Sequence, residues 1–203
     1  MMVAALYVEP DGAYFGQPDV DPRDESRDAR LYAGPHPVVA HPPCKRWGRF
    51  WHGCPIKPHV FKLGTDAGCF AAALTSVRNW GGCLEHPADS QAFAYFGLAK
   101  PERHKGWQPA DRFGAACYVE QGHYGHVARK PTWLYAVGSS FPDLNWSRGE
   151  QRLPAYAVER YGYEKARRIG VMAAIGTKRK TILRDATPAQ FRDVLLAIAR
   201  GDR

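Results

Sequence analysis

Short apolar runs, each followed by a turn or a proline, are spread along the first two thirds of the chain. They are too short for helices, and their apolar character is typical of buried strands. Several of them end beside polar side chains, so their ends are natural places for chemistry. The runs are Ala4–Val8, Pro37–His41, Cys83–Glu85, Ala115–Gln121 and Thr132–Val137.

Longer amphipathic stretches lie between and after these runs. Ala67–Trp80 has the spacing of a helix, Asp66 is placed to cap its first turn, and two glycines follow it. Residues 89–97 predict a second, short helix. A final amphipathic helix starts at Thr187, which we expect to act as its N-cap, with a proline in the first turn.

The alternation of strands and helices predicts an α/β fold with three layers and a partly parallel sheet. We expect residues 1–147 to form the core and residues 148–203 to form a basic helical region packed on the same domain. Residues 16–30 are polar and predict a loop or short helix. Because ligands of such sheets bind beyond the carboxyl ends of the strands, the polar residues after the second and third runs should share one cleft.

The formal net charge of +8 is unevenly distributed. Residues 1–30 carry seven acidic and three basic side chains, whereas residues 148–203 carry thirteen basic and six acidic ones. A basic end on a near-neutral body favours a polyanionic partner, with nucleic acid, and DNA in particular, as the leading class. A solvated basic surface explains the same pattern without a partner. The cations that we expect to contact phosphates include Arg168, Lys178, Arg179 and Lys180.

Cysteine content and hydropathy argue against several other classes of protein. Five cysteines without a C-x-x-C pair do not suggest a disulfide framework, so we expect most of them to be thiols in a reducing compartment. No apolar run approaches the roughly 18–20 residues of a membrane span. The first residues do not resemble a secretory signal. The sequence therefore predicts a cytoplasmic protein without a membrane partner.

Cys44 is the candidate nucleophile. It follows a Pro-Pro pair that keeps the backbone extended, and Lys45 and Arg46 come directly after it. Nearby cations favour the thiolate, which is the reactive form of cysteine. The alternative is a half-buried structural cysteine beside Trp47.

Glu85 is the candidate acid. Because it lies within an apolar run, we expect burial to raise its pKa, so that it holds a proton near neutral pH and donates it to a ring nitrogen. The alternative is a buried salt bridge with Arg129 or Lys130.

Other residues are weaker candidates for contact with a base. Gln121, His123 and His126 lie in a glycine-containing loop, where they would hydrogen-bond a base or a phosphate or simply form a surface turn. Trp47 is a candidate stacking surface, although most tryptophans in a domain of this size belong to the core. A set of histidines and cysteines at 41, 44, 52 and 54 has no tight zinc-type spacing, so we assign no metal site.

The two proline-containing motifs together resemble the DNA cytosine-5 methyltransferases. Residues 41–44 (His-Pro-Pro-Cys) look like that family's Pro-Cys loop, whose cysteine attacks C6 of a flipped-out cytosine. Residues 83–87 (Cys-Leu-Glu-His-Pro) look like its Glu-Asn-Val/Pro motif, whose glutamate engages N3 of the base, and the separation of 41 residues between Cys44 and Glu85 is similar. Residues 124–133 resemble a later Tyr-Gly and Lys-Pro-Thr segment of phage-encoded members.

This resemblance implies a Rossmann-like methyltransferase core that is truncated at its N-terminus. It also implies S-adenosylmethionine as donor, but the family's Phe-x-Gly-x-Gly turn is not found, and Gly12 and Gly16 are a poor substitute. The cofactor is therefore left unassigned. A chain that keeps the base-handling half of the site and uses another donor, or none, would resemble the small phage proteins that alter or sense modified bases.

We therefore carry two hypotheses forward. The first is a nucleic-acid pyrimidine-modifying transferase with a cysteine nucleophile, and the second is a non-catalytic nucleic-acid-binding or inhibitory protein that retains a degenerate pocket. The residues assigned to catalysis are His41, Cys44, Glu85, Arg129 and Lys130. Those assigned to substrate binding are Pro43, Trp47, His86, Gln121, His123, Tyr124 and His126.

Overall fold

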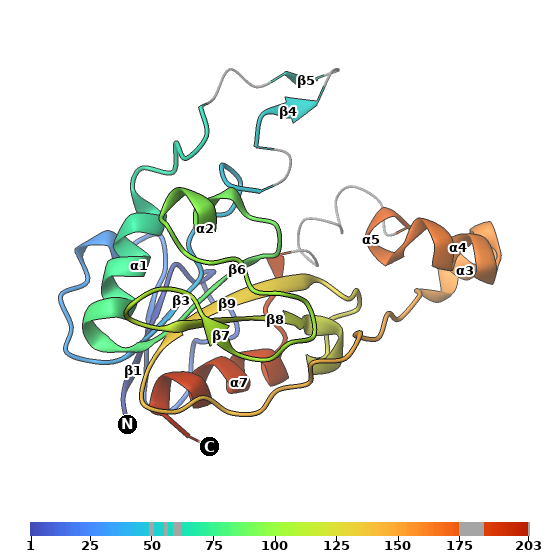
Figure 1. Cartoon of the computed structure of the whole chain (residues 1–203). Helices are drawn as coiled ribbons and strands as arrows, with labels where there is room; N and C mark the ends of the chain where they lie inside the picture. The colour runs from blue at the N-terminus through green and yellow to red at the C-terminus, as the bar shows by residue number, and fades with distance from the viewer. Residues whose placement is uncertain (49–50, 55–56, 59–61, 175–184, 203) are drawn as a thin grey trace.

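The computed structural model describes residues 1–48, 51–54, 57–58, 62–174 and 185–202. Its centre is a seven-stranded sheet with the order β2-β1-β3-β6-β9-β8-β7 (Figure 1). A separate pair of short strands, β4 and β5, projects beyond the sheet (Figure 1). The strands are β1 (Val3–Leu6), β2 (Val20–Arg23), β3 (Val38–Ala40), β4 (Gly53–Cys54), β5 (Lys57–Pro58), β6 (Gly82–Pro87), β7 (Gln108–Pro109), β8 (Ala115–Glu120) and β9 (Pro131–Val137).

One half of the sheet is parallel and the other is antiparallel. Strands β2, β1, β3 and β6 run parallel to one another, and β9 then pairs antiparallel with both β6 and β8. Strand β7 is antiparallel to β8. The prediction of an α/β fold with a partly parallel sheet is confirmed, and all five predicted runs form strands of this sheet.

Helices cover both faces of the sheet (Figure 1). Side chains along each strand alternate between the two faces, so both faces carry apolar side chains that the helices bury. Helix α1 (Cys69–Trp80) and the short α2 (Gln91–Tyr95) contribute to the core on one face. Helix α7 (Ala189–Arg200) buries Phe191 and Leu195 on the other face. Within the described residues, no helix is long and apolar enough to cross a membrane.

The caps of two helices differ from the predicted ones. Helix α1 begins after Gly68, yet the Asp66 carboxylate still accepts hydrogen bonds from the backbone N–H groups of Gly68 and Phe70. Helix α7 follows Pro188 and has no side-chain cap, so Thr187 does not act as predicted.

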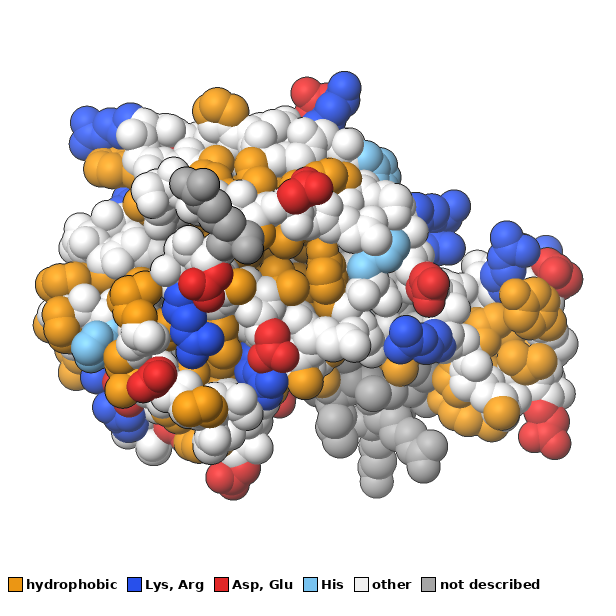
Figure 2. Space-filling model, turned by 90° about the horizontal axis from the view of Figure 1, so that it is seen from below, with side chains coloured by type: hydrophobic (Ala, Val, Ile, Leu, Met, Phe, Trp, Pro, Cys, Tyr) orange, Lys and Arg blue, Asp and Glu red, His pale blue; other side chains and the backbone are white. Residues whose placement is uncertain are grey.

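Three short helices form an arm beside the sheet, drawn in orange in Figure 1. They are α3 (Ala155–Tyr161), α4 (Tyr163–Ile169) and α5 (Val171–Ala174). The arm packs on the core through Val171, which contacts a small apolar cluster around Ala128. In Figure 2 it is the lobe at the right, where cationic side chains lie around exposed apolar ones. The exposed apolar residues of the arm include Tyr156, Tyr163 and Ile169.

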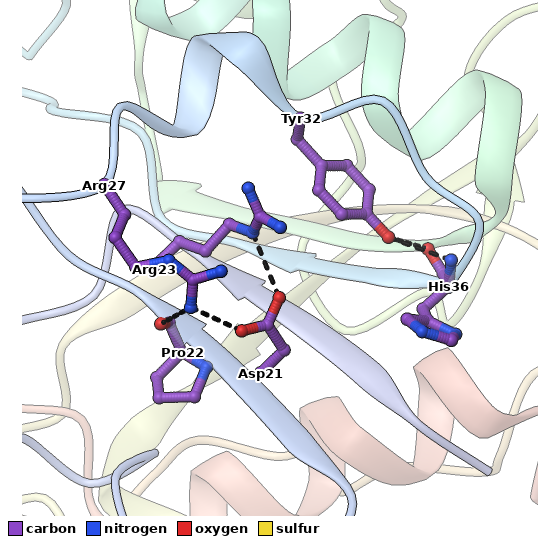
Figure 3. A network of polar contacts seen from close by, with 6 residues as sticks. All are labelled: Asp21, Pro22, Arg23, Arg27, Tyr32 and His36. Atoms are coloured by element: carbon purple, nitrogen blue, oxygen red, sulfur yellow. Dashed lines mark hydrogen bonds and ion pairs between the residues drawn. The ribbon is translucent and has the colours of Figure 1, made fainter.

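Residues 20–23, predicted as part of a loop or short helix, form the edge strand β2 instead. Figure 3 shows the polar contacts that hold this edge. The Asp21 carboxylate accepts from Arg23 Nε at 3.1 Å and from Arg27 Nη1 at 2.5 Å. The Arg23 guanidinium lies 5.0 Å from the ring centroid of Tyr32, whose hydroxyl donates to the carbonyl oxygen of His36. These tertiary contacts stabilise a strand that its polar composition disfavours.

Both edge strands contain a proline. Pro22 lies in β2 opposite Ala5, and Pro109 lies in β7 opposite Ala115. Proline has no backbone N–H to give to a further strand, so within a strand it is tolerated best at the edge of a sheet.

Gly82 provides a test of the central register. It has φ of +103°, and a Cβ atom built on it would lie 2.0 Å from the Val38 carbonyl oxygen of the neighbouring strand. We expect Gly82→Ala to lower the free energy of unfolding by about 3 kcal/mol, because backbone atoms must separate. Gly97→Ala is the control, since Gly97 also has a positive φ (+72°) but open space around it. This substitution should lower the free energy of unfolding by only about 1 kcal/mol. Equal losses in urea denaturation would contradict the proposed steric constraint.

Candidate functional site

A cavity of about 470 Å³ lies at the carboxyl ends of the central parallel strands. Strand β1 is followed in the chain by β2 on one side, whereas β3 lies on the other side of β1. The strand order therefore reverses between β1 and β3, and this is where open α/β sheets bind ligands. The lining comes from residues 7–9, 13–14, 41–45, 85, 87 and 130–132, together with residues 185 and 187 before α7.

His41 and Glu85 form the polar centre of this cavity. They lie one residue beyond the paired positions Ala40 and Leu84 of β3 and β6, so the sheet register brings them side by side. His41 Nδ1 is 3.1 Å from Glu85 Oε2, and the two side chains are 14% and 12% exposed. Residues of both proline-containing motifs line this cavity, as the sequence predicts.

Tyr14 extends this pair into the loop after β1. Its buried hydroxyl is 2.8 Å from His41 Nε2, and burial raises the pKa of Tyr14 well above its ordinary value. The hydroxyl therefore stays protonated, and the imidazole of His41 bridges it to the Glu85 carboxylate, to which Nδ1–H donates. Tyr14 had no sequence signal, because only the folded loop brings it to His41.

Glu85 also accepts a hydrogen bond from the opposite side. Gln121 Nε2 lies 3.1 Å from Glu85 Oε1 and 2.9 Å from the Thr132 hydroxyl oxygen. Burial by itself would raise the pKa of Glu85, but the hydrogen bond and charge of His41, with the charge of Lys130, hold that pKa well below its ordinary range. Glu85 is thus an ionised acceptor, and the prediction that it is a protonated acid at neutral pH is wrong.

Lys130 adds a cation to the lining of the same cavity. Its ammonium group donates to the Ala186 carbonyl oxygen at 3.0 Å, and its backbone has φ of +44°. Burial lowers the pKa of Lys130, while the charges of Glu85, Asp185 and Cys44 act in the other direction. Cys44 lies in the same lining and is half-buried, and Pro43 lines the cavity beside it. A carboxylate, an ammonium and a thiol therefore face one space.

Two residues assigned to substrate binding lie in the core instead. Trp47 is 1% exposed, packs on Phe70 and donates its indole N–H to Asp66. His86 is fully buried against the same Phe70 ring, because it points to the face of β6 opposite to Glu85. Neither belongs to the lining of the cavity, so neither is placed to contact a base there.

Three side chains of the loop after β8 hydrogen-bond backbone atoms and do not line the cavity. His123 Nε2 lies 3.1 Å from the Ser147 carbonyl oxygen, Tyr124 accepts from the Asn145 N–H, and His126 Nδ1 accepts from the Ala128 N–H. Gln121 acts through Glu85 and does not line the cavity. These positions fit the alternative interpretation of a turn, with Gln121 as a positioning residue.

The remaining predicted residues lie elsewhere. Arg129, next to Lys130, points away from this cavity into a second one. Arg168 is exposed on α4. Lys178, Arg179 and Lys180 lie outside the described residues, so their predicted phosphate contacts stay predictions. Among the described residues, no group of three or more His, Cys, Asp or Glu side chains is arranged to hold a metal ion.

The buried His86 makes a pH-dependent contribution to stability. Burial lowers its pKa to about 4 from an ordinary value near 6.5, so the unfolded chain takes up its proton first as the pH falls. Relative to His86→Leu, the wild type should lose about 2 kcal/mol of unfolding free energy between pH 7 and pH 5. Urea denaturation at both pH values measures this difference. Parallel pH curves for the two proteins would show that His86 is not held neutral.

Tyr14 and Tyr7 form a matched pair for testing the hydrogen bond to His41. Tyr14→Phe removes a buried hydroxyl and leaves His41 Nε2 unsatisfied, which should cost about 1–2 kcal/mol of stability. Tyr7 also lines the cavity, but its buried hydroxyl has no hydrogen-bond partner in the described part of the chain. Tyr7→Phe should therefore be neutral or stabilising in the same denaturation experiment. A larger loss for Tyr7→Phe would contradict this arrangement.

The chain matches no family model and has no significant match among curated proteins.

Proposed function

We propose that the chain binds a pyrimidine base of a nucleic acid in the cavity at the ends of β1, β3 and β6, and that Cys44 adds to C6 of that base. The observation that carries the proposal is the convergence of Cys44, Glu85 and Lys130 on one cavity at the point where the strand order reverses. A flipped-out or single-stranded base is required, because C6 of a stacked base is out of reach.

Sequence and geometry support this proposal together. The Pro-Cys and Glu-His-Pro motifs lie at the ends of β3 and β6, which are neighbours in the sheet. Their resemblance to the cytosine-5 methyltransferases implies that one motif attacks the base while the other holds its opposite edge. The parallel half of the sheet, covered by helices on both faces, is compatible with the Rossmann-like core that this resemblance implies.

The chemistry of the addition needs only groups of the cavity and water. The Cys44 thiolate forms a C–S bond to C6, and the electron pair of the C5–C6 double bond moves toward the ring carbonyl. C5 thereby becomes nucleophilic and takes a proton from water unless another electrophile is present. Lys130 stabilises negative charge on the ring, and ionised Glu85 accepts a hydrogen bond from a ring or amino N–H. Loss of a proton from C5 and departure of the thiolate reverse the reaction.

The residues after β1 do not fit S-adenosylmethionine. No helix begins in the described loop between β1 and β2, so there is no helix N-terminus beside a glycine turn. Instead, the fully buried Tyr14 ring fills the loop and Arg192 donates to the carbonyl oxygen of Ala13. We therefore derive no methyl-transfer step.

A second candidate function is binding without catalysis. It is favoured by one observation, namely that both oxygens of Glu85 already accept hydrogen bonds from His41 and Gln121. A carboxylate so engaged can serve as a fixed recognition group for a base. In this case Cys44 would contact the base but form no bond.

Hydrogen exchange at C5 separates the two candidates without any donor. Wild-type protein and a single-stranded oligonucleotide are incubated in D₂O, and the digested nucleosides are analysed by mass spectrometry. Reversible addition of Cys44 predicts a mass increase of one unit on cytosine or uracil, and Cys44→Ala should abolish it. Anisotropy with the same labelled oligonucleotide should give both proteins similar affinities.

Each other outcome points to a different conclusion. Binding by both proteins without deuterium incorporation supports the non-catalytic candidate. Exchange that persists in Cys44→Ala contradicts the role of this thiol, and a lack of oligonucleotide binding contradicts the nucleic-acid partner.

A further inference from the structure

A second cavity, of about 250 Å³, lies between the core and the helical arm. Arg129 contributes to it from the core, whereas Tyr163 and Arg167 contribute from α4. Residues 149–153 form the remaining wall and connect the two parts of the chain. The arm is held here by a hydrogen bond from the Arg152 N–H to the Val127 carbonyl oxygen.

Arg129 is oriented for an additional ligand. Its Nε donates to the Gly149 carbonyl oxygen at 3.1 Å, which fixes the guanidinium plane. Its two terminal nitrogens make no further hydrogen bond or ion pair with the described residues, and they are not sealed from solvent. A guanidinium that is anchored at Nε and open at both terminal nitrogens presents the fork that binds an oxoanion through two parallel hydrogen bonds.

The positive charge in this cavity is poorly compensated by nearby carboxylates. Within the described part of the chain, the Arg167 guanidinium has Glu164 as its one ion-pair partner, at 4.0 Å, and both side chains are more than 60% exposed. Glu150 also lines the cavity, but its side chain is 73% exposed and its nearest ion-pair partner is Arg152, at 3.9 Å. Two guanidinium groups that share one small cavity repel each other, and an anion between them removes this cost.

We propose that this second cavity binds a backbone phosphate of a nucleic-acid strand, held by Arg129 and Arg167. The Tyr163 hydroxyl is a further donor in the lining. The proposal rests on the nucleic-acid partner of the proposed function, but it does not depend on the chemistry of Cys44.

The surface next to this cavity favours a nucleic-acid strand over a single phosphate ion as the ligand. Residues 149–168 carry five cationic and three acidic side chains, and the arm also exposes Tyr156 and Tyr163. Cations interspersed with aromatic rings are typical of surfaces that bind single strands. Lys130 faces the base cavity and Arg129 faces the second one. Adjacent residues would therefore contact a base and a phosphate of the same strand.

The test compares two arginines of equal charge. Binding of a labelled single-stranded oligonucleotide is measured by anisotropy at several salt concentrations for wild type, Arg129→Ala and Arg148→Ala. Arg148 is exposed and lies outside the lining of the cavity. Arg129→Ala should weaken binding about tenfold and reduce the log–log salt slope by about 0.7. Arg148→Ala should weaken binding less than about threefold.

A second variant and two smaller probes complete the experiment. Arg129→Lys keeps the charge but loses the fork, so its affinity should fall between those of wild type and Arg129→Ala. Unfolding curves check that each variant is folded. Inorganic phosphate and a nucleoside monophosphate should compete with the oligonucleotide only at far higher concentrations.

The alternative outcomes overturn the proposal in distinct ways. Equal losses for Arg129→Ala and Arg148→Ala would show that only the total charge matters. Competition by the monophosphate at concentrations close to those of the oligonucleotide would assign the cavity to a free phosphate ester. Binding that depends on Arg129 in a protein without deuterium exchange would support this cavity while removing the covalent step of the proposed function.

Discussion

The carboxylate of Glu85 is buried in the central strand β6, and its charge needs hydrogen-bond donors and cations around it. The residues that supply them organise the rest of the molecule. An isolated buried charge costs several kcal/mol, so its partners have to be held in place. His41 reaches it from the end of β3, Gln121 from the end of β8, and the Thr132 hydroxyl in β9 fixes the Gln121 amide. Tyr14 adds the loop after β1. One anion thus joins both halves of the mixed sheet, and the cavity forms around it.

Two neighbouring residues, Arg129 and Lys130, line two different cavities. Lys130, with its positive φ, directs its ammonium group toward Glu85 and Cys44, whereas Arg129 directs its guanidinium toward the arm. Non-glycine residues in this backbone region are uncommon and are often found at functional sites. The strained backbone lets two consecutive cations serve two cavities. A ligand with both a planar ring and a phosphate matches this pair.

The sequence predicts the strands of the core and the meeting of the two proline-containing motifs at one cavity, because both depend on local patterns. The apolar runs are short and end at prolines, and the carboxyl ends of neighbouring parallel strands necessarily meet. Strand β2 was missed because the residues of Val20–Arg23 favour a loop, and only their pairing with β1 makes them a strand. The pKa direction of Glu85 was wrong because its partners come from distant segments. His86 and Trp47 were misassigned because the side of the sheet that a residue faces depends on the register.

The prolines of the edge strands have a consequence for assembly. Pro22 and Pro109 each remove one backbone N–H from an edge strand of the sheet, and these strands have only four and two residues. A continuous intermolecular ladder cannot form across either edge, since each lacks the N–H that the next strand would need. At the two edges of this sheet, self-association through added strands is therefore disfavoured, and contacts between side chains of the arm or the helix-covered faces are the more favourable route.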